Sequence, residues 1–176
     1  SMTHLADTID IHVGGRDLVF PHHENEIAQS EAATGEQFTK YWLHTALLQT
    51  KGEKMSSSLG NFTTAHDLVE EYGPNVTRMF ADSSSYNTVA TFSAETLAEA
   101  EERWERLERG YERAVEACDG PDARTKVESE AVREAVETAR TDAREGMNDD
   151  FDTRAAVSAL LDLVAAVNRH LDESEA

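Results

Sequence analysis

Two residues near the start of the chain have the types and spacing to bind a metal ion. His22 and Glu26 lie four residues apart, so in a helix their side chains share one face. Imidazole and carboxylate groups are both ligands that zinc accepts. His23 is expected to point about 100° away from His22 and therefore not to join the pair. A polar pair on a helix surface is the commoner explanation of such spacing, because zinc usually takes three or four ligands.

A second stretch, from Gly52 to Phe62, has the composition of a phosphate-binding loop. Between its glycines it carries Lys54, Met55, Ser56, Ser57 and Ser58. A lysine ammonium offsets negative charge that develops on phosphate, while hydroxyls and backbone N–H groups donate hydrogen bonds to it. A flexible polar loop without a ligand is the alternative. By itself the loop favours neither interpretation.

A strand and a glycine turn are predicted to precede the possible metal site. The strand spans Thr8 to His12, and Gly14 and Gly15 are expected to form a turn where the backbone can approach a ligand closely. His12 and Asp17 would then flank a crevice between this strand and the following helix.

A helix is predicted over residues 21–34, with Pro21 in its first turn and Gly35 as its stop. Apolar residues from Tyr41 to Leu48 indicate a strand or a short helix, which feeds a strand near Leu47–Thr50 and then the lysine loop. Strands alternating with a helix indicate half of a doubly wound, nucleotide-binding parallel sheet.

The remainder of the chain is predicted to be helical. A short helix over 64–72 should end at Gly73-Pro74, and a second should begin near Val76. Three longer amphipathic helices follow, the first capped by Ser93, the second over 129–146 and the third capped by Asp152. Short turns between amphipathic helices predict an all-α bundle. Cys118 continues the apolar stripe of the first long helix and is expected to be a buried small hydrophobe.

The charge of the chain is strongly acidic. Lys and Arg number 16 against 35 Asp and Glu, giving a formal net charge of −19. A protein that binds RNA would be expected to carry a basic stripe, and none is evident. A high-salt cytoplasm would reconcile RNA binding with the acidic net charge. At molar salt the Debye length is about 3 Å, so repulsion between the chain and RNA phosphates is screened. A chain that never touches RNA is the competing interpretation.

The two stretches together resemble cysteinyl-tRNA synthetase, a class I aminoacyl-tRNA synthetase. The resemblance rests on the run from Phe20 through Glu31, on residues 40–44, on the loop of residues 54–62, and on the segment 148–153. It implies an α/β half of a class I Rossmann-like nucleotide-binding catalytic domain, followed by an all-α helical bundle. The expected divisions are residues 1–62 for the catalytic part, 63–92 for a connecting region that contacts the tRNA stem, and 93–176 for the bundle.

The resemblance also implies roles for individual residues. His22 and Glu26 match zinc ligands that hold the substrate thiolate, and His12 and Asp17 match positions that line the cysteine pocket. Residues 54–58 match the loop that binds ATP, with magnesium, during adenylation. The implied activity is ATP-dependent activation of cysteine and its transfer to tRNA(Cys).

Two departures from the family pattern bear on activity. Ser57 stands where the family usually has a second lysine, so slower adenylation is expected. The chain also starts inside the family pattern, without the early ATP signature and the zinc cysteines. We therefore expect a C-terminal part of a synthetase that by itself is inactive and binds zinc weakly or not at all, with the remaining zinc ligands outside this chain.

Two other functions remain open at this stage. One is a related cysteine ligase that acylates a small amine, and the other is a non-catalytic, truncated binding module. Because no run of about 18 apolar residues occurs, no membrane partner is expected. A single cysteine fits a reducing compartment, so the expected location is the cytoplasm and the expected state is a monomer.

Overall fold

The computed structural model divides the chain into two compact units. Unit 1 comprises Ser1–Asn61 and Tyr86–Thr91, and unit 2 comprises Phe62–Ser85 and Phe92–Ala176. The residues that the structure describes are 4–50, 53–54, 63–118 and 129–175. The loop residues 55–58 that match the ATP-binding loop lie outside these ranges, as does the Lys54 side chain.

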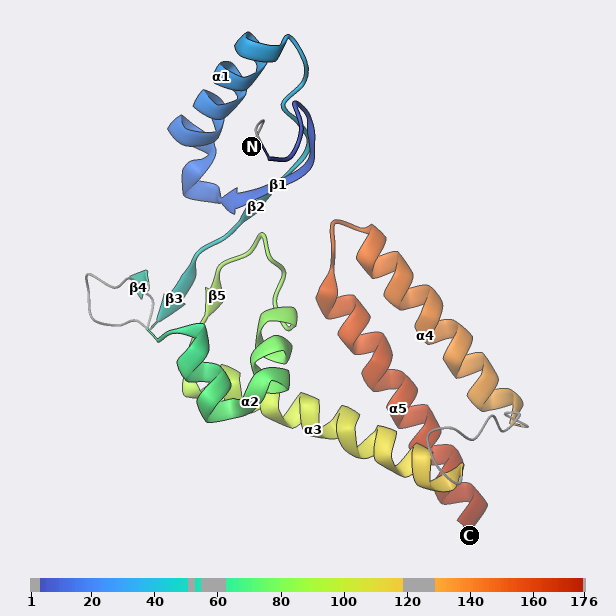
Figure 1. Ribbon diagram of the computed structural model, residues 1–176. Helices are drawn as coiled ribbons and strands as arrows, with labels where there is room; N and C mark the ends of the chain where they lie inside the picture. Colours follow the sequence, from blue (N-terminus) through green and yellow to red (C-terminus); the bar gives the residue numbers. More distant parts are fainter. Residues whose placement is uncertain (1–3, 51–52, 55–62, 119–128, 176) are drawn as a thin grey trace. The chain divides into compact units, whose positions relative to one another are not determined.

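Unit 1 begins with a strand–helix–strand segment (Figure 1). Strand β1 (Ile9–Gly15) leads through two short helical turns, Arg16–Leu18 and Val19–His23, into helix α1 (Glu24–Thr34). Strand β2 (Thr39–Thr45) then returns parallel to β1. The parallel pairing agrees with the predicted half of a nucleotide-binding sheet, since parallel neighbours need a helical crossover between them.

A second small sheet completes unit 1. Strand β3 (Leu48–Thr50) pairs antiparallel with β4 (Glu53–Lys54) and parallel with β5 (Ala90–Thr91). The predicted strand near Leu47–Thr50 is therefore confirmed, and it delivers the chain to the start of the lysine loop. The third strand comes from far along the sequence.

In the part of unit 2 that the structure describes, all the regular secondary structure is helical. Its members are α2 (Ala65–Asp82), α3 (Ala94–Ala117), α4 (Glu130–Asn148) and α5 (Thr153–Glu175). Within it α4 packs along α5, while α3 packs against both α2 and α5. Buried Val76, Met79 and Ala100 form the centre of a hydrophobic cluster that joins α2 to α3.

Capping residues begin these helices where the sequence predicts. Ser93 accepts a hydrogen bond from the Thr96 N–H, and Asp152 accepts one from the Ala155 N–H. The predicted break at Gly73 is also confirmed: its φ of +80° and ψ of 162° interrupt α2, so that two helices meet there at a kink. Only glycine adopts such a backbone conformation without strain.

Three local predictions are wrong. Gly14 and Gly15 continue β1 instead of forming a turn, because both pair with β2. Helix α1 begins at Glu24, after a π-helical turn in which Phe20 has extended backbone angles. Cys118 is exposed, since α3 ends at Ala117 and the apolar stripe stops with it.

Candidate metal and amino-acid site

The parallel pairing of β1 and β2 gathers aromatic side chains on one face of the small sheet. His12 pairs in register with Trp42, and Gly14 pairs with His44. Residues two apart on a strand face the same side, so the three rings lie together. The ring centroids of His12 and Trp42 are 4.5 Å apart, and Trp42 stacks on His44 at 5.9 Å with an interplanar angle of 7°.

His23 enters this cluster from the turn that precedes α1. Its side chain is buried, with 3% of its surface exposed. Its Nδ1 lies 3.0 Å from Nε2 of His44, so one ring donates a hydrogen bond and the other accepts it. Burial lowers the pKa of His23, and the neighbouring imidazoles of His12 and His44 lower it further. A neutral His23 is the state that can serve as a hydrogen-bond acceptor or a ligand.

Glu26 brings a carboxylate to this cluster. Its Oε2 lies 3.3 Å from Nε2 of His12 and 3.8 Å from Nε2 of His22. That oxygen is buried, and within the described part of the chain it has no hydrogen-bond partner. A buried carboxylate oxygen without a partner is costly, and a metal ion is one partner that would satisfy it.

The residues best placed to surround one ion are His12, His23 and Glu26. One ligand atom from each lies within 4.8 Å of the others. The expectation that His23 points away from this site is therefore wrong. It assumed an ideal helix, whereas the chain before Glu24 is a π-helical turn with a kink at Phe20.

His22 and Asp17 lie nearer the edge of the site. The His22 side chain is 59% exposed and reaches Glu26 only loosely, at 3.8 Å. Asp17 is exposed on the turn Arg16–Leu18, and its carboxylate folds back beside Gly15. The structure thus brings His12 and His22 beside Glu26, but the group with metal-ligand spacing is His12, His23 and Glu26, and both His22 and Asp17 lie outside it.

Sequence reasoning did not include Trp42 and His44 in the site. Their signal was the alternation over residues 42–44, which in a strand puts both side chains on one face. It becomes informative only when β2 is known to pair with β1 in a register that sets His44 opposite Gly14.

Comparison with known proteins defines the class. Residues 1–102 match the family model of the tRNA synthetases class I (C) catalytic domain, and residues 143–176 match the DALR domain. The first match covers more than half of the chain, which therefore belongs to the class I (C) tRNA synthetase catalytic-domain family. A LeuRS–tRNA–LeuAMS ternary complex from Agrobacterium radiobacter shares the fold, with a TM-score of 0.74 over 93% of this chain and 23% of that chain, at 18% identity.

Individual relatives narrow the comparison. The chain is similar to the cysteine–tRNA ligase of Haloarcula marismortui, with 66% identity over 98% of this chain and 35% of the relative. The corresponding protein of Halobacterium salinarum is 59% identical over 99% of this chain and 35% of its own length, and that of Geobacter sulfurreducens is 47% identical over 99% and 36%. The chain thus spans about a third of the length of these relatives. The two halophile relatives agree with the halophilic origin expected from the net charge of −19.

None of the helices in the described part of the chain is both long and apolar enough to span a membrane.

Proposed function

We propose that this chain contributes to a cysteine–tRNA ligase, which activates cysteine with ATP and transfers it to tRNA(Cys). The observation that carries the proposal is the buried Oε2 of Glu26, which lies beside His12 and His22 and, within the described residues, accepts no hydrogen bond. It lies in a chain of the class I family whose three relatives above are named cysteine–tRNA ligase. Those names favour tRNA over a small amine as the acceptor. The proposed ligase works as a monomer in the cytoplasm.

The proposed metal is zinc, held by His22 and Glu26 together with ligands from outside this chain. His22 is the exposed histidine of the cluster, so its Nε2 is open to an ion that also binds groups elsewhere. Bound zinc would hold the sulfur of cysteine and so distinguish it from serine.

The other three histidines of the cluster, His12, His23 and His44, are proposed to form the wall of the pocket. His23 is buried, hydrogen-bonded to His44 and held neutral by its lowered pKa, which leaves Glu26 as the negative group of the cluster. His12 lies between Glu26 and the Trp42 ring, and with Asp17 it is proposed to line the cysteine pocket.

The ATP site is proposed at residues 54–58, with ATP bound together with magnesium. Lys54 is the last residue of β4, which pairs with β3 in the three-stranded sheet of unit 1. Residues that follow a strand edge in this way can reach the phosphates of a bound nucleotide. Lys54 would stabilise the charge of the adenylation transition state, and Ser56, Ser57 and Ser58 would donate hydrogen bonds.

The test is cysteine-dependent ATP–pyrophosphate exchange in high KCl. The 176-residue chain is supplied with the N-terminal half of the Haloarcula marismortui relative. We expect exchange that requires both halves and that Lys54→Ala and His22→Ala each reduce at least about 100-fold. Exchange that survives both substitutions would contradict the assignment of these residues.

His66→Ala is a matched control for His22→Ala. His66 and Glu70 have the same four-residue spacing as His22 and Glu26, and Nε2 of His66 lies 3.3 Å from Oε1 of Glu70. Both of these side chains are largely exposed on α2. The same two variants are then compared for zinc content after dialysis of the assembled halves. Loss of zinc from His22→Ala alone supports the metal assignment, and equal zinc content in the two variants contradicts it.

A further inference from the structure

We propose that Arg16 is a positioning residue, which holds the proposed cysteine pocket in a fixed orientation relative to the strands that carry the proposed ATP loop. Arg16 begins the turn Arg16–Leu18 between β1 and α1. Its Nη2 donates a hydrogen bond of 2.7 Å to the backbone carbonyl of Asn87, which lies 71 residues further along the chain. Both residues belong to unit 1. The inference rests on the proposed function, because that function requires the two sites to act on one pair of substrates.

The two proposed sites of unit 1 are built on two separate sheets. The cysteine pocket lies beside the pair β1-β2, whereas Lys54 lies on β4 in the sheet of order β4-β3-β5. Two residues, Ala46 and Leu47, join β2 to β3 along the chain. Each residue of such a connection has two soft backbone dihedral angles. The connection by itself therefore does not fix the angle between the two sheets.

The segment 86–91 provides a second point of attachment between the sheets. The carbonyl of Tyr86 accepts a hydrogen bond of 2.8 Å from the N–H of Ala46, in the connection itself. The segment then continues as β5, which pairs in parallel with β3. It thus belongs to the sheet that carries Lys54, and Arg16 ties it to the end of β1. Two attachments, one through the chain and one through Arg16, hold the sheets at a single angle.

The contact of Arg16 also fixes the turn that carries Asp17. A hydrogen bond with an ionised donor is roughly twice as strong as one between neutral groups, and the guanidinium group of Arg16 is such a donor. The carboxylate of the next residue, Asp17, lies against the backbone of Gly15. Arg16 therefore anchors the turn from its outer side while Asp17 faces the end of β1, beside the proposed pocket.

Activation of cysteine depends on the relative orientation of its two substrates. A carboxylate oxygen of cysteine forms a bond to the α-phosphorus of ATP while the bond from that phosphorus to the departing pyrophosphate breaks. A misplacement of about 1 Å between reacting groups can cost about 100-fold in rate. A contact that fixes one sheet against the other should therefore affect the rate at saturating substrate more than the binding of either substrate.

The first experiment measures kcat and both KM values for pyrophosphate exchange in the assembled halves. We expect Arg16→Gln to lower kcat about tenfold and to change the KM for cysteine and for ATP less than about threefold. Arg16→Lys keeps a charged donor and should recover most of the kcat. Lys40→Gln is the matched control, because it removes the same charge from an exposed pair with Asp10 between β2 and β1, and it should leave kcat unchanged.

Three kinetic results would overturn the inference. The first is an unchanged kcat in Arg16→Gln. The second is a loss confined to the KM for one substrate, which would indicate a contact with that substrate and not the positioning of both. The third is an equal loss of kcat in Arg16→Gln and Lys40→Gln, since the change of charge alone would then explain it.

Amide hydrogen exchange of the 176-residue chain tests the contact without catalysis. Peptides that cover residues 86–91 should exchange about threefold faster or more in Arg16→Gln than in Lys40→Gln or the unsubstituted chain. Equal rates in the three proteins would overturn the inference. If the unsubstituted halves show no pyrophosphate exchange, the proposed function is contradicted, and amide exchange alone then decides whether Arg16 holds the two sheets together.

Discussion

The backbone of Gly14 lies so close to the ring of His23 that a Cβ atom at Gly14 would be 2.5 Å from both Cε1 and Nε2 of the imidazole. That separation is far below van der Waals contact. Gly14 is also the register partner of His44, to which His23 is hydrogen-bonded. Because Gly14 has no side chain, the buried His23 ring can lie against strand β1 and reach His44.

Gly14→Ala should displace His23 and lower the free energy of unfolding by about 1–3 kcal/mol, as overpacking of a buried site does. Chemical denaturation in high KCl measures this change. Gly15→Ala is the control, because the atom a Cβ would meet there is the carboxylate end of the exposed Asp17 side chain and not a buried ring. Equal losses in the two variants would mean that contact with His23 does not decide the cost.

Gly110→Ala should destabilise the packing of α3 on α5. A Cβ atom at Gly110 would overlap the side chain of Val164, and the expected cost is about 1–3 kcal/mol. In the double variant Gly110→Ala with Val164→Ala the overlap is gone, so the two substitutions should cost less together than the sum of their separate effects. Denaturation of the three variants measures this coupling; strict additivity would argue against contact.

Asp152 should make stability depend on acidity at the start of α5. The hydrogen bond from the Ala155 N–H, with a smaller contribution from Arg154, holds the pKa of this carboxyl below its ordinary value. The unfolded chain therefore binds the proton more readily, and the stabilisation is complete above about pH 4 and lost as pH falls through the folded pKa. Asp152→Asn, which still caps the helix, should show a shallower loss of stability in acid. Parallel curves for the two proteins would exclude this role.

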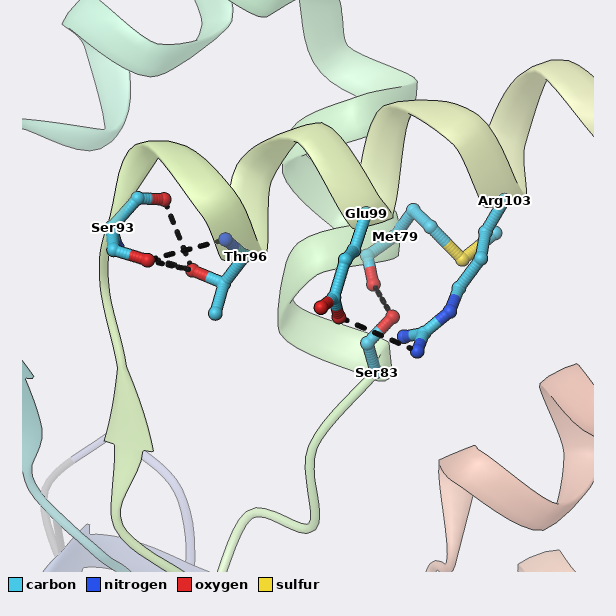
Figure 2. Close-up of polar contacts among 6 residues, drawn as sticks. All are labelled: Met79, Ser83, Ser93, Thr96, Glu99 and Arg103. Carbon is cyan, nitrogen blue, oxygen red and sulfur yellow. Dashed lines mark hydrogen bonds and ion pairs between the residues drawn. The ribbon is translucent and has the colours of Figure 1, made fainter.

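Ser93→Ala should weaken the start of α3 by about 1 kcal/mol. The Ser93 hydroxyl accepts from the Thr96 N–H at 3.2 Å (Figure 2). The Ser93 N–H in turn donates to the Thr96 hydroxyl at 3.1 Å. Ser93→Asp keeps an acceptor at the cap and should restore most of the loss. The thermal midpoints of the three proteins give the comparison, and a midpoint for Ser93→Asp as low as that for Ser93→Ala would show that the cap is not the cause.

The elements of this fold could be predicted wherever one residue type decides the local backbone. The kink at Gly73, the left-handed cap at Gly35 and the cap at Ser93 follow from such residues. The apolar stripe of α3 correctly places Leu97 and Ala100 in the interior. The prediction that this stripe continues to a buried Cys118 is wrong, because sequence periodicity does not show where a partner helix stops covering the stripe.

The site could be predicted only in part. His22 and Glu26 were identified by their spacing, yet His66 and Glu70 have the same spacing and lie exposed on α2. What separates the two pairs is the neighbourhood supplied by β1 and β2, which buries one oxygen of Glu26. The position of His23 depends on a helical turn of irregular geometry, and no sequence period describes that turn.

The short strand β5 determines which fragments of this protein proteolysis or truncation would produce. The chain leaves unit 1 after Asn61, returns to it at Tyr86 and leaves again after Thr91. A protease cut after Asn61 therefore leaves β5 on the same fragment as the helices. A cut after Ser85 or after Thr91 leaves α2 covalently attached to residues 1–61 of unit 1. A helical fragment expressed from Phe62 onward would carry β5 without its partner β3, and would present that strand's unpaired N–H and C=O groups to other chains.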